Sequence, residues 1–152
     1  MLTLSELKTG FQGWHNLGGT TKATATGWRL RRAMLKGMRG LLKKAGLETT
    51  IDQAGNIIGK RKGKKPSLKP IAFGSHIDMV PDGGNYDGTL GSIAALEVIE
   101  VLNENKVVTN HPLEVIIFAD EEGSMIGSKA LSGKITPEIL NQTSHSGLTI
   151  SE

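Results

Sequence analysis

Apolar residues recur at helical spacing near the start of the chain, in WRLRRAMLKGMRGLLKKA (28–45), with arginines and lysines between them. The apolar positions are Leu30, Met34, Met38, Leu41 and Leu42. This spacing predicts an amphipathic helix that lies on a sheet, and Gly46 directly after it is typical of a helix C-cap. The methionines are predicted to fill the core rather than to form a binding groove.

Short apolar runs separated by turn residues follow this helix. LETTID and NIIGKRK, joined by QAG, predict a hairpin over residues 47–62. KPIAFGS (69–75) predicts a buried strand, and HPLEVIIFA (111–119) predicts a second central strand. Between them, residues 90–105 predict a helix, and short helices are predicted in SMIGSKALSG and TPEIL. The residues of helix 90–105 expected to lie mostly inward are Ile93, Leu96, Val98, Ile99 and Leu102.

This alternation of strands and helices predicts an α/β fold with a mixed, mostly parallel central sheet flanked by helices. At least two central strands are expected to be parallel. In such sheets the functional crevice lies outside the carboxyl ends of the strands. Two acidic clusters, within residues 76–87 and 120–122, fall at those ends, so we expect the chemistry of the protein there.

The composition narrows the class of protein. A chain of 152 residues fits one domain, and the absence of cysteine excludes disulfides and thiolate metal ligands. The opening MLTLSELKTGFQGW lacks the pattern of a signal peptide, and no apolar run is long enough to span a bilayer. We therefore expect a cytoplasmic protein with no membrane partner.

The charge is distributed unevenly. Residues 1–70 hold 15 of the 18 Lys and Arg residues but only 3 of the 15 Asp and Glu residues. The basic run GKRKGKKPSLK leaves open a module that binds nucleic acid or an acidic partner. We favour a solvated loop, because glycine and proline interrupt the run and no aromatic residue stands among the charges to stack on bases. The prediction is therefore a protein that does not bind nucleic acid.

The glycine-rich loop GSHIDMVPDGGNYDG (74–88) holds the first group of candidate site residues. His76 directly follows the predicted strand, and Asp78 stands two residues later. A ligating imidazole usually donates its second ring N–H to a carboxylate, and the carboxylate of Asp78 is placed to accept it. Asp87 is next along the loop, and a carboxylate can bridge two metal ions through its two oxygens.

The segment DEEG (120–123) holds the second group, at the end of the other strand. Neighbours in an extended segment point to opposite sides, so Glu121 and Glu122 can differ in role. One can bind a metal while the other faces the water that attacks the substrate. Each residue alone has an ordinary structural explanation, but the joint placement of His76, Asp87 and Glu122 favours a hydrolytic metal site.

GSHIDMVPDGGNYDGTLG followed by IIFADEEGSMIGSKALSG resembles the M20 metallopeptidase superfamily. More narrowly, the chain resembles the hydantoinase/carbamoylase amidases, which include N-carbamoyl-L-amino-acid hydrolases, allantoate amidohydrolases and β-ureidopropionases. LGGT (17–20) and AGLETTIDQAGNIIGKRKG (45–63) add to the match. The set of His-x-Asp, Tyr-Asp-Gly and Glu-Glu-Gly motifs in this order is specific, and the resemblance extends from about residue 17 onward.

The resemblance implies a role for each candidate. His76 binds the first of two divalent ions, Asp87 bridges both, and Glu122 binds the second. Glu121 acts as the general base, and Asp78 orients His76. Zn²⁺, Mn²⁺ or Co²⁺ would each suit these oxygen and imidazole ligands.

The implied reaction is hydrolysis of a C–N bond in a small-molecule substrate, an N-carbamoyl amino acid or a ureido compound such as allantoate. The alternatives are an aminopeptidase or N-acyl-amino-acid deacylase of the same superfamily, and a non-catalytic binding module that uses the basic half. Met125 and Ile126 stand where the family commonly has Arg-Phe, a difference that bears on the substrate.

Length gives a further expectation. Family members are several hundred residues long, and they carry an inserted dimerisation domain and further ligands. The resemblance therefore implies that residues 1–152 are the N-terminal part of a metal-dependent catalytic domain, without the dimerisation domain and the C-terminal remainder. We expect little activity from such a truncated chain alone, and a homodimer only for a full-length form.

Overall fold

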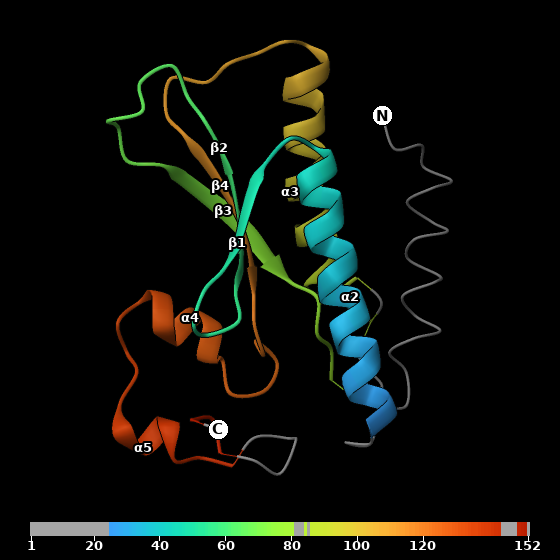
Figure 1. Ribbon diagram of the computed structural model, residues 1–152, viewed down its shortest axis with the longest axis vertical. Helices are drawn as coiled ribbons and strands as arrows, with labels where there is room; N and C mark the ends of the chain where they lie inside the picture. The colour runs from blue at the N-terminus through green and yellow to red at the C-terminus, as the bar shows by residue number, and fades with distance from the viewer. Residues whose placement is uncertain (1–24, 81–83, 85, 144–148, 152) are drawn as a thin grey trace.

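The computed structural model describes residues 25–80, 84, 86–143 and 149–151, with side chains from residue 35 onward. Its elements follow the predicted order (Figure 1). They are α2 (Ala25–Lys44), β1 (Glu48–Ile51), β2 (Ile57–Arg61), β3 (Ile71–His76), α3 (Thr89–Glu104), β4 (Leu113–Phe118), α4 (Ile126–Leu131) and α5 (Pro137–Leu140). In this part of the chain no helix is both long and apolar enough to cross a membrane. The cytoplasmic location stays a prediction.

The four described strands form one sheet in the order β1-β2-β4-β3. β3 and β4 are parallel, whereas β1 with β2 and β2 with β4 are antiparallel. The predicted mixed sheet with flanking helices is confirmed. Its mostly parallel character is wrong for the described strands, because the β1–β2 hairpin joins β4 in the antiparallel sense and contributes two of the three pairings.

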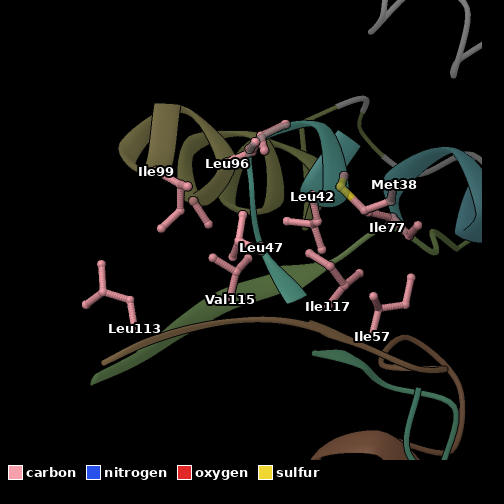
Figure 2. Packing of buried hydrophobic residues seen from close by; sticks show 12 residues of the cluster. Met38, Leu42, Leu47, Ile57, Ile77, Leu96, Ile99, Leu113, Val115 and Ile117 are labelled. Atoms are coloured by element: carbon pink, nitrogen blue, oxygen red, sulfur yellow. The ribbon is translucent and has the colours of Figure 1, made fainter. Parts of the chain in front are cut away.

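The core lies between one face of the sheet and the helices α2 and α3 (Figure 2). Every second residue of β4 faces this layer, which is the alternation that a strand imposes on its side chains. The largest contributions come from buried residues of both helices and the two central strands: Met38, Leu42, Leu96, Ile99, Ile57, Val115 and Ile117. Of the residues predicted to face inward from the first helix, the side chains of Leu30 and Met34 lie outside the described residues.

Two predictions about burial are wrong. β3 was expected to be buried, but it lies at the edge of the described sheet, and Ile71 is 52% exposed. Val98 on α3 is also exposed, whereas Ile93 and Leu102 pack against the core. An apolar run in the sequence cannot tell an edge strand from a central one, because the order of strands is set by long-range pairing.

α2 ends at Lys44, and Gly46 forms the predicted turn after it. Gly46 has φ +82, its N–H donates to Lys43 O, and Leu47 N–H donates to Leu42 O. These two bonds form a Schellman motif, which satisfies helix carbonyls that would otherwise lack partners. The turn directs the chain from the helix into β1.

Two glycines near this helix end should respond oppositely to alanine. Gly40 lies inside α2, and a Cβ there would meet no atom within 4 Å. Gly40→Ala should raise the free energy of unfolding by about 0.5–1 kcal/mol. Gly46→Ala also enters open space, but its left-handed backbone should cost about 1–2 kcal/mol. Thermal unfolding of the two variants and the wild type tests this, and equal effects at both positions would contradict it.

Part of the basic run has a structural role. Lys60 Nζ lies 3.0 Å from Glu114 Oε1, and Arg61 donates hydrogen bonds to Asn103 Oδ1 and Val107 O. These contacts join β2 to β4 and to the end of α3. Whether the protein binds nucleic acid stays a prediction.

Candidate metal centre

The candidate site lies where β3 and β4 end together. The parallel register places His76, the last residue of β3, beside Phe118, the last residue of β4. Glu121 and Glu122 follow three and four residues after Phe118, so the topology brings both sequence motifs to the same edge of the sheet. The carboxyl ends of parallel strands are where α/β proteins place their functional crevices.

His76, Asp87 and Glu122 converge, as the sequence predicted. Each offers one ligand atom, and these atoms lie within 4.8 Å of one another. His76 is buried, Glu122 is half-buried and Asp87 is exposed. Ligand atoms bound to a single Zn²⁺ at roughly 2.0–2.2 Å lie about 3–4 Å apart, so small side-chain movements would close this group around an ion.

The ring of His76 is oriented through its Nδ1 atom. Nδ1 lies 3.0 Å from the backbone oxygen of Asp78 and 3.7 Å from its Oδ1 atom. A carbonyl oxygen can only accept a hydrogen bond, so this contact requires the proton on Nδ1. The lone pair is then on Nε2, which lies 4.0 Å from Asp87 Oδ1 and 3.6 Å from Glu121 Oε2. This is the tautomer in which Nε2 can bind a metal.

The carboxylate of Asp78 links the two strand ends. Its Oδ2 atom accepts a hydrogen bond of 3.0 Å from the backbone N–H of Glu122. Asp78 therefore contacts His76 mainly through its backbone and the Glu121–Glu122 segment through its side chain. Both halves of the site are connected by this one residue.

Gly88 packs directly against the ring of His76, where a side chain would not fit. A Cβ on Gly88 would lie 2.2–2.5 Å from three atoms of the imidazole, and the residue has φ +64. Only glycine combines this backbone conformation with so close an approach. The Asp-Gly pair at the start of α3 therefore places a carboxylate and the ring of His76 side by side.

A tight turn carries the two glutamates. Asp120 and Met125 both have left-handed backbones, with φ 49 and φ 53. Asp120 Oδ2 accepts hydrogen bonds from the backbone N–H and the hydroxyl of Ser124, and Asp120 O accepts one from Met125 N–H. These bonds close the turn that carries Glu121 and Glu122.

The site is electrostatically unfavourable for Glu122. Its pKa is raised above the usual value, chiefly by a hydrogen bond to the Asp87 side chain, with desolvation and repulsion from Asp87 adding to the effect. Two carboxylates this close are most readily accommodated when they share a proton or bind a cation. This donor set of one imidazole and two carboxylates fits a divalent transition metal.

The raised pKa gives a prediction about metal affinity. A carboxyl with a raised pKa keeps its proton to a higher pH, and a metal must displace that proton. As the pH is lowered below the pKa of Glu122, we expect the Zn²⁺ affinity of the chain to fall about tenfold per pH unit for each proton that the metal displaces. Because this pKa is raised, the fall should start at a higher pH than for an ordinary glutamate. Titration calorimetry at several pH values measures this. An affinity that does not change across the range of carboxyl titration would contradict it.

The five acidic and imidazole residues that the sequence predicts for the site lie close together here, and their roles stay predictions. Sequence reasoning missed two neighbours. Gly88 could be noticed only as the residue after Asp87, without its contact to the ring. Asn56 was assigned to the hairpin, although it is fully buried and reaches the turn that carries the glutamates. A polar residue directly before an apolar strand was the available signal.

Comparison with known proteins supports the resemblance inferred from the motifs. A family model described as Peptidase family M28 matches residues 56–144. N-carbamoyl-L-amino acid amidohydrolase of Geobacillus stearothermophilus is 40% identical over 140 residues, which cover 89% of this chain and 34% of the relative. Allantoate deiminase of Arabidopsis thaliana is 38% identical over 122 residues, which cover 76% of this chain and 23% of the relative.

Solved structures share the fold. A hydantoinase/carbamoylase family amidase from Burkholderia ambifaria matches with a TM-score of 0.80 and 27% identity, over 96% of this chain and 38% of that chain. An amidase of the same family from Burkholderia vietnamiensis matches with a TM-score of 0.78 and 32% identity, over the same shares of the two chains. The chain thus spans at most about a third of the length of the curated relatives described above.

Proposed function

Since this chain belongs to the M28/M20-like peptidases, in their hydantoinase/carbamoylase family, we propose that the complete protein is a metal-dependent amidohydrolase. Its substrate would be an N-carbamoyl amino acid or a ureido compound such as allantoate, and the bond cleaved is a C–N bond of the carbamoyl or ureido group. The observation that carries this proposal is the convergence of His76, Asp87 and Glu122 within 4.8 Å, with Glu121 beside them.

We assign the ligands by their chemistry. His76 would hold one ion through Nε2, Glu122 would hold a second, and Asp87 would bridge the pair. When bound, such ions polarise a carbonyl oxygen and lower the pKa of a water molecule. Three side chains are few for two ions, so within the described residues the centre is open to further ligands or to substrate. Zn²⁺, Mn²⁺ and Co²⁺ all suit this donor set.

Glu121 is the proposed general base. Its Oε2 atom lies 3.6 Å from His76 Nε2, so the carboxylate faces the same space as the metal ligands. There it would take a proton from the attacking water and deliver it to the leaving nitrogen as the C–N bond breaks. Asp78 would act as a positioning residue, because it contacts both His76 and the backbone of Glu122.

The relatives support the class of substrate. Three of their names are N-carbamoyl-L-amino acid amidohydrolase, allantoate deiminase and ureidoglycolate hydrolase, and all three name linear carbamoyl or ureido compounds. Met125, at the start of α4, is 44% exposed.

A substrate panel tests the proposal. The complete protein, loaded in turn with Zn²⁺, Mn²⁺ or Co²⁺, is assayed with N-carbamoyl amino acids, allantoate, ureidoglycolate, a dipeptide and an N-acetyl amino acid. We expect release of the amine or ammonia from at least one carbamoyl or ureido compound, and loss of this activity in a chelator. Turnover of the dipeptide or the N-acetyl compound alone would favour a peptidase or deacylase instead.

A further inference from the structure

Asn56 is a fully buried polar residue outside the candidate metal centre. It lies between the hairpin turn and β2, and its side-chain amide makes three hydrogen bonds. Nδ2 donates to Asp52 Oδ2 at 2.8 Å and to Gly127 O at 3.1 Å, and Oδ1 accepts from Ala119 N–H at 2.9 Å. A buried amide is tolerated when it is bonded in this way and is costly otherwise.

Two of these partners enclose the turn that carries the glutamates. Ala119 comes directly before residues 120–126, and Gly127 comes directly after them. We call this pair the neck of the turn. One backbone bond, from Gly127 N–H to Ala119 O at 3.1 Å, crosses the neck directly. Asn56 makes the second crossing, because its amide bonds both residues at once.

The orientation of the amide is fixed by its surroundings. Asp52 accepts hydrogen bonds from the backbone N–H groups of Ala54 and Asn56 as well as from Nδ2. Exchanging Oδ1 and Nδ2 would face oxygen with oxygen at Asp52 and nitrogen with nitrogen at Ala119. Gly127 also has no room for a side chain, since a Cβ there would lie 2.1 Å from Asn56 Oδ1. These contacts fix which way the Asn56 amide faces.

We propose that Asn56 is a positioning residue of the metal centre: it holds the neck closed and thereby sets Glu121 and Glu122 against His76 and Asp87. The metal role of these groups rests on the proposed function, whereas the link between Asn56 and the turn does not. The most direct reporter is the Glu122 N–H to Asp78 Oδ2 bond, which joins the turn to the end of β3. Loosening the neck should weaken that bond.

The double variant Asp52→Asn/Asn56→Asp, the exchanged pair, separates the two roles of Asn56. It keeps a side-chain contact within the hairpin and changes the contact that positions the turn with the glutamates. It keeps the net charge, and an amide at 52 can still donate to a carboxylate at 56. The bond from Ala119 N–H also keeps its acceptor. At a pH where the new carboxyl at 56 is ionised, the bond to Gly127 O is lost, because two oxygens then face each other. Asn103→Ala is the matched control, because Asn103 also joins two elements by donating to Ala45 O at 2.7 Å. Asn103 lies at the far end of α3, about 20 Å from Gly88.

The variants are compared as 152-residue chains by thermal unfolding, by amide hydrogen exchange without metal, and by Zn²⁺ affinity. In the exchanged pair we expect Glu122 and Ser124 amides to exchange about tenfold faster, the effect of one lost hydrogen bond, with β4 and α3 unchanged. Zn²⁺ should bind at least about tenfold more weakly, because the proposed ligand Glu122 lies on the displaced turn. Asn103→Ala should lower stability without either effect.

Unchanged exchange at Glu122 in the folded exchanged pair would overturn the proposal. If the exchanged pair does not fold, Asn56→Ser takes its place, because serine is too short to bond both sides of the neck. If neither variant folds, Asn56 is a residue of general stability, and the proposal is overturned too. Absence of Zn²⁺ binding in the wild type would refute the metal premise of the proposed function. The exchange experiment would still decide the role of Asn56.

Discussion

Replacing Glu121 with glutamine should slow turnover by the complete protein severely and leave its metal content unchanged. The amide keeps the size of the side chain but cannot accept a proton. Loss of a general base typically costs about 10²–10⁴-fold in rate, and we expect kcat to fall by that amount with little change in KM. Steady-state kinetics and metal analysis of the purified variant measure both effects.

A ligand substitution provides the contrast to Glu121→Gln. Glu122→Gln removes a charged ligand rather than a base, so metal content and activity should fall together. The two positions are neighbours with the same side chain, which makes this a matched comparison. Equal metal loss in both variants, or substantial turnover by Glu121→Gln, would contradict the roles assigned to the pair.

The second large effect is expected at Gly88. In Gly88→Ala the new methyl group would lie 2.2–2.5 Å from atoms of the His76 ring, so the imidazole must leave its present position. The backbone at φ +64 adds a strain of about 1–3 kcal/mol. We expect the affinity for Zn²⁺ to drop by more than about tenfold through loss of one well-placed ligand, together with lower thermal stability.

Gly84→Ala controls for a glycine substitution in the same loop. A Cβ at Gly84 would meet no atom within 4 Å, so the variant should bind Zn²⁺ as the wild type does. Calorimetric titration of both variants, each checked for folding by circular dichroism, makes the comparison. Wild-type affinity in Gly88→Ala would show that the ring of His76 does not take part in binding.

Much of the fold could be predicted because its signals are local. The hairpin, the helix end at Gly46 and the central strand β4 each follow from spacing and turn residues within a short segment. The edge position of β3 could not be predicted, since it depends on which strands pair. Val98 was misplaced because an apolar residue on a helix can lie at the margin of the buried stripe.

The residues of the site also divide into those that local signals predict and those that depend on the folded structure. His76 and the Glu121–Glu122 pair were predictable because the ends of parallel strands meet at one edge of the sheet. The contact between Gly88 and the imidazole was not, because it arises from a backbone conformation of the folded loop. Asn56 was missed for a similar reason, since its partners Ala119 and Gly127 are 63 and 71 residues away along the chain.

The central claim is that His76, Asp87 and Glu122 form one binding centre for divalent metal. The most direct test is a crystal structure of the protein with Zn²⁺, with the ion located by its anomalous scattering at the zinc absorption edge. We predict a strong peak bonded to His76 Nε2 and to carboxylate oxygens of Asp87 or Glu122. A zinc-loaded crystal in which these three side chains hold no ion would contradict the claim.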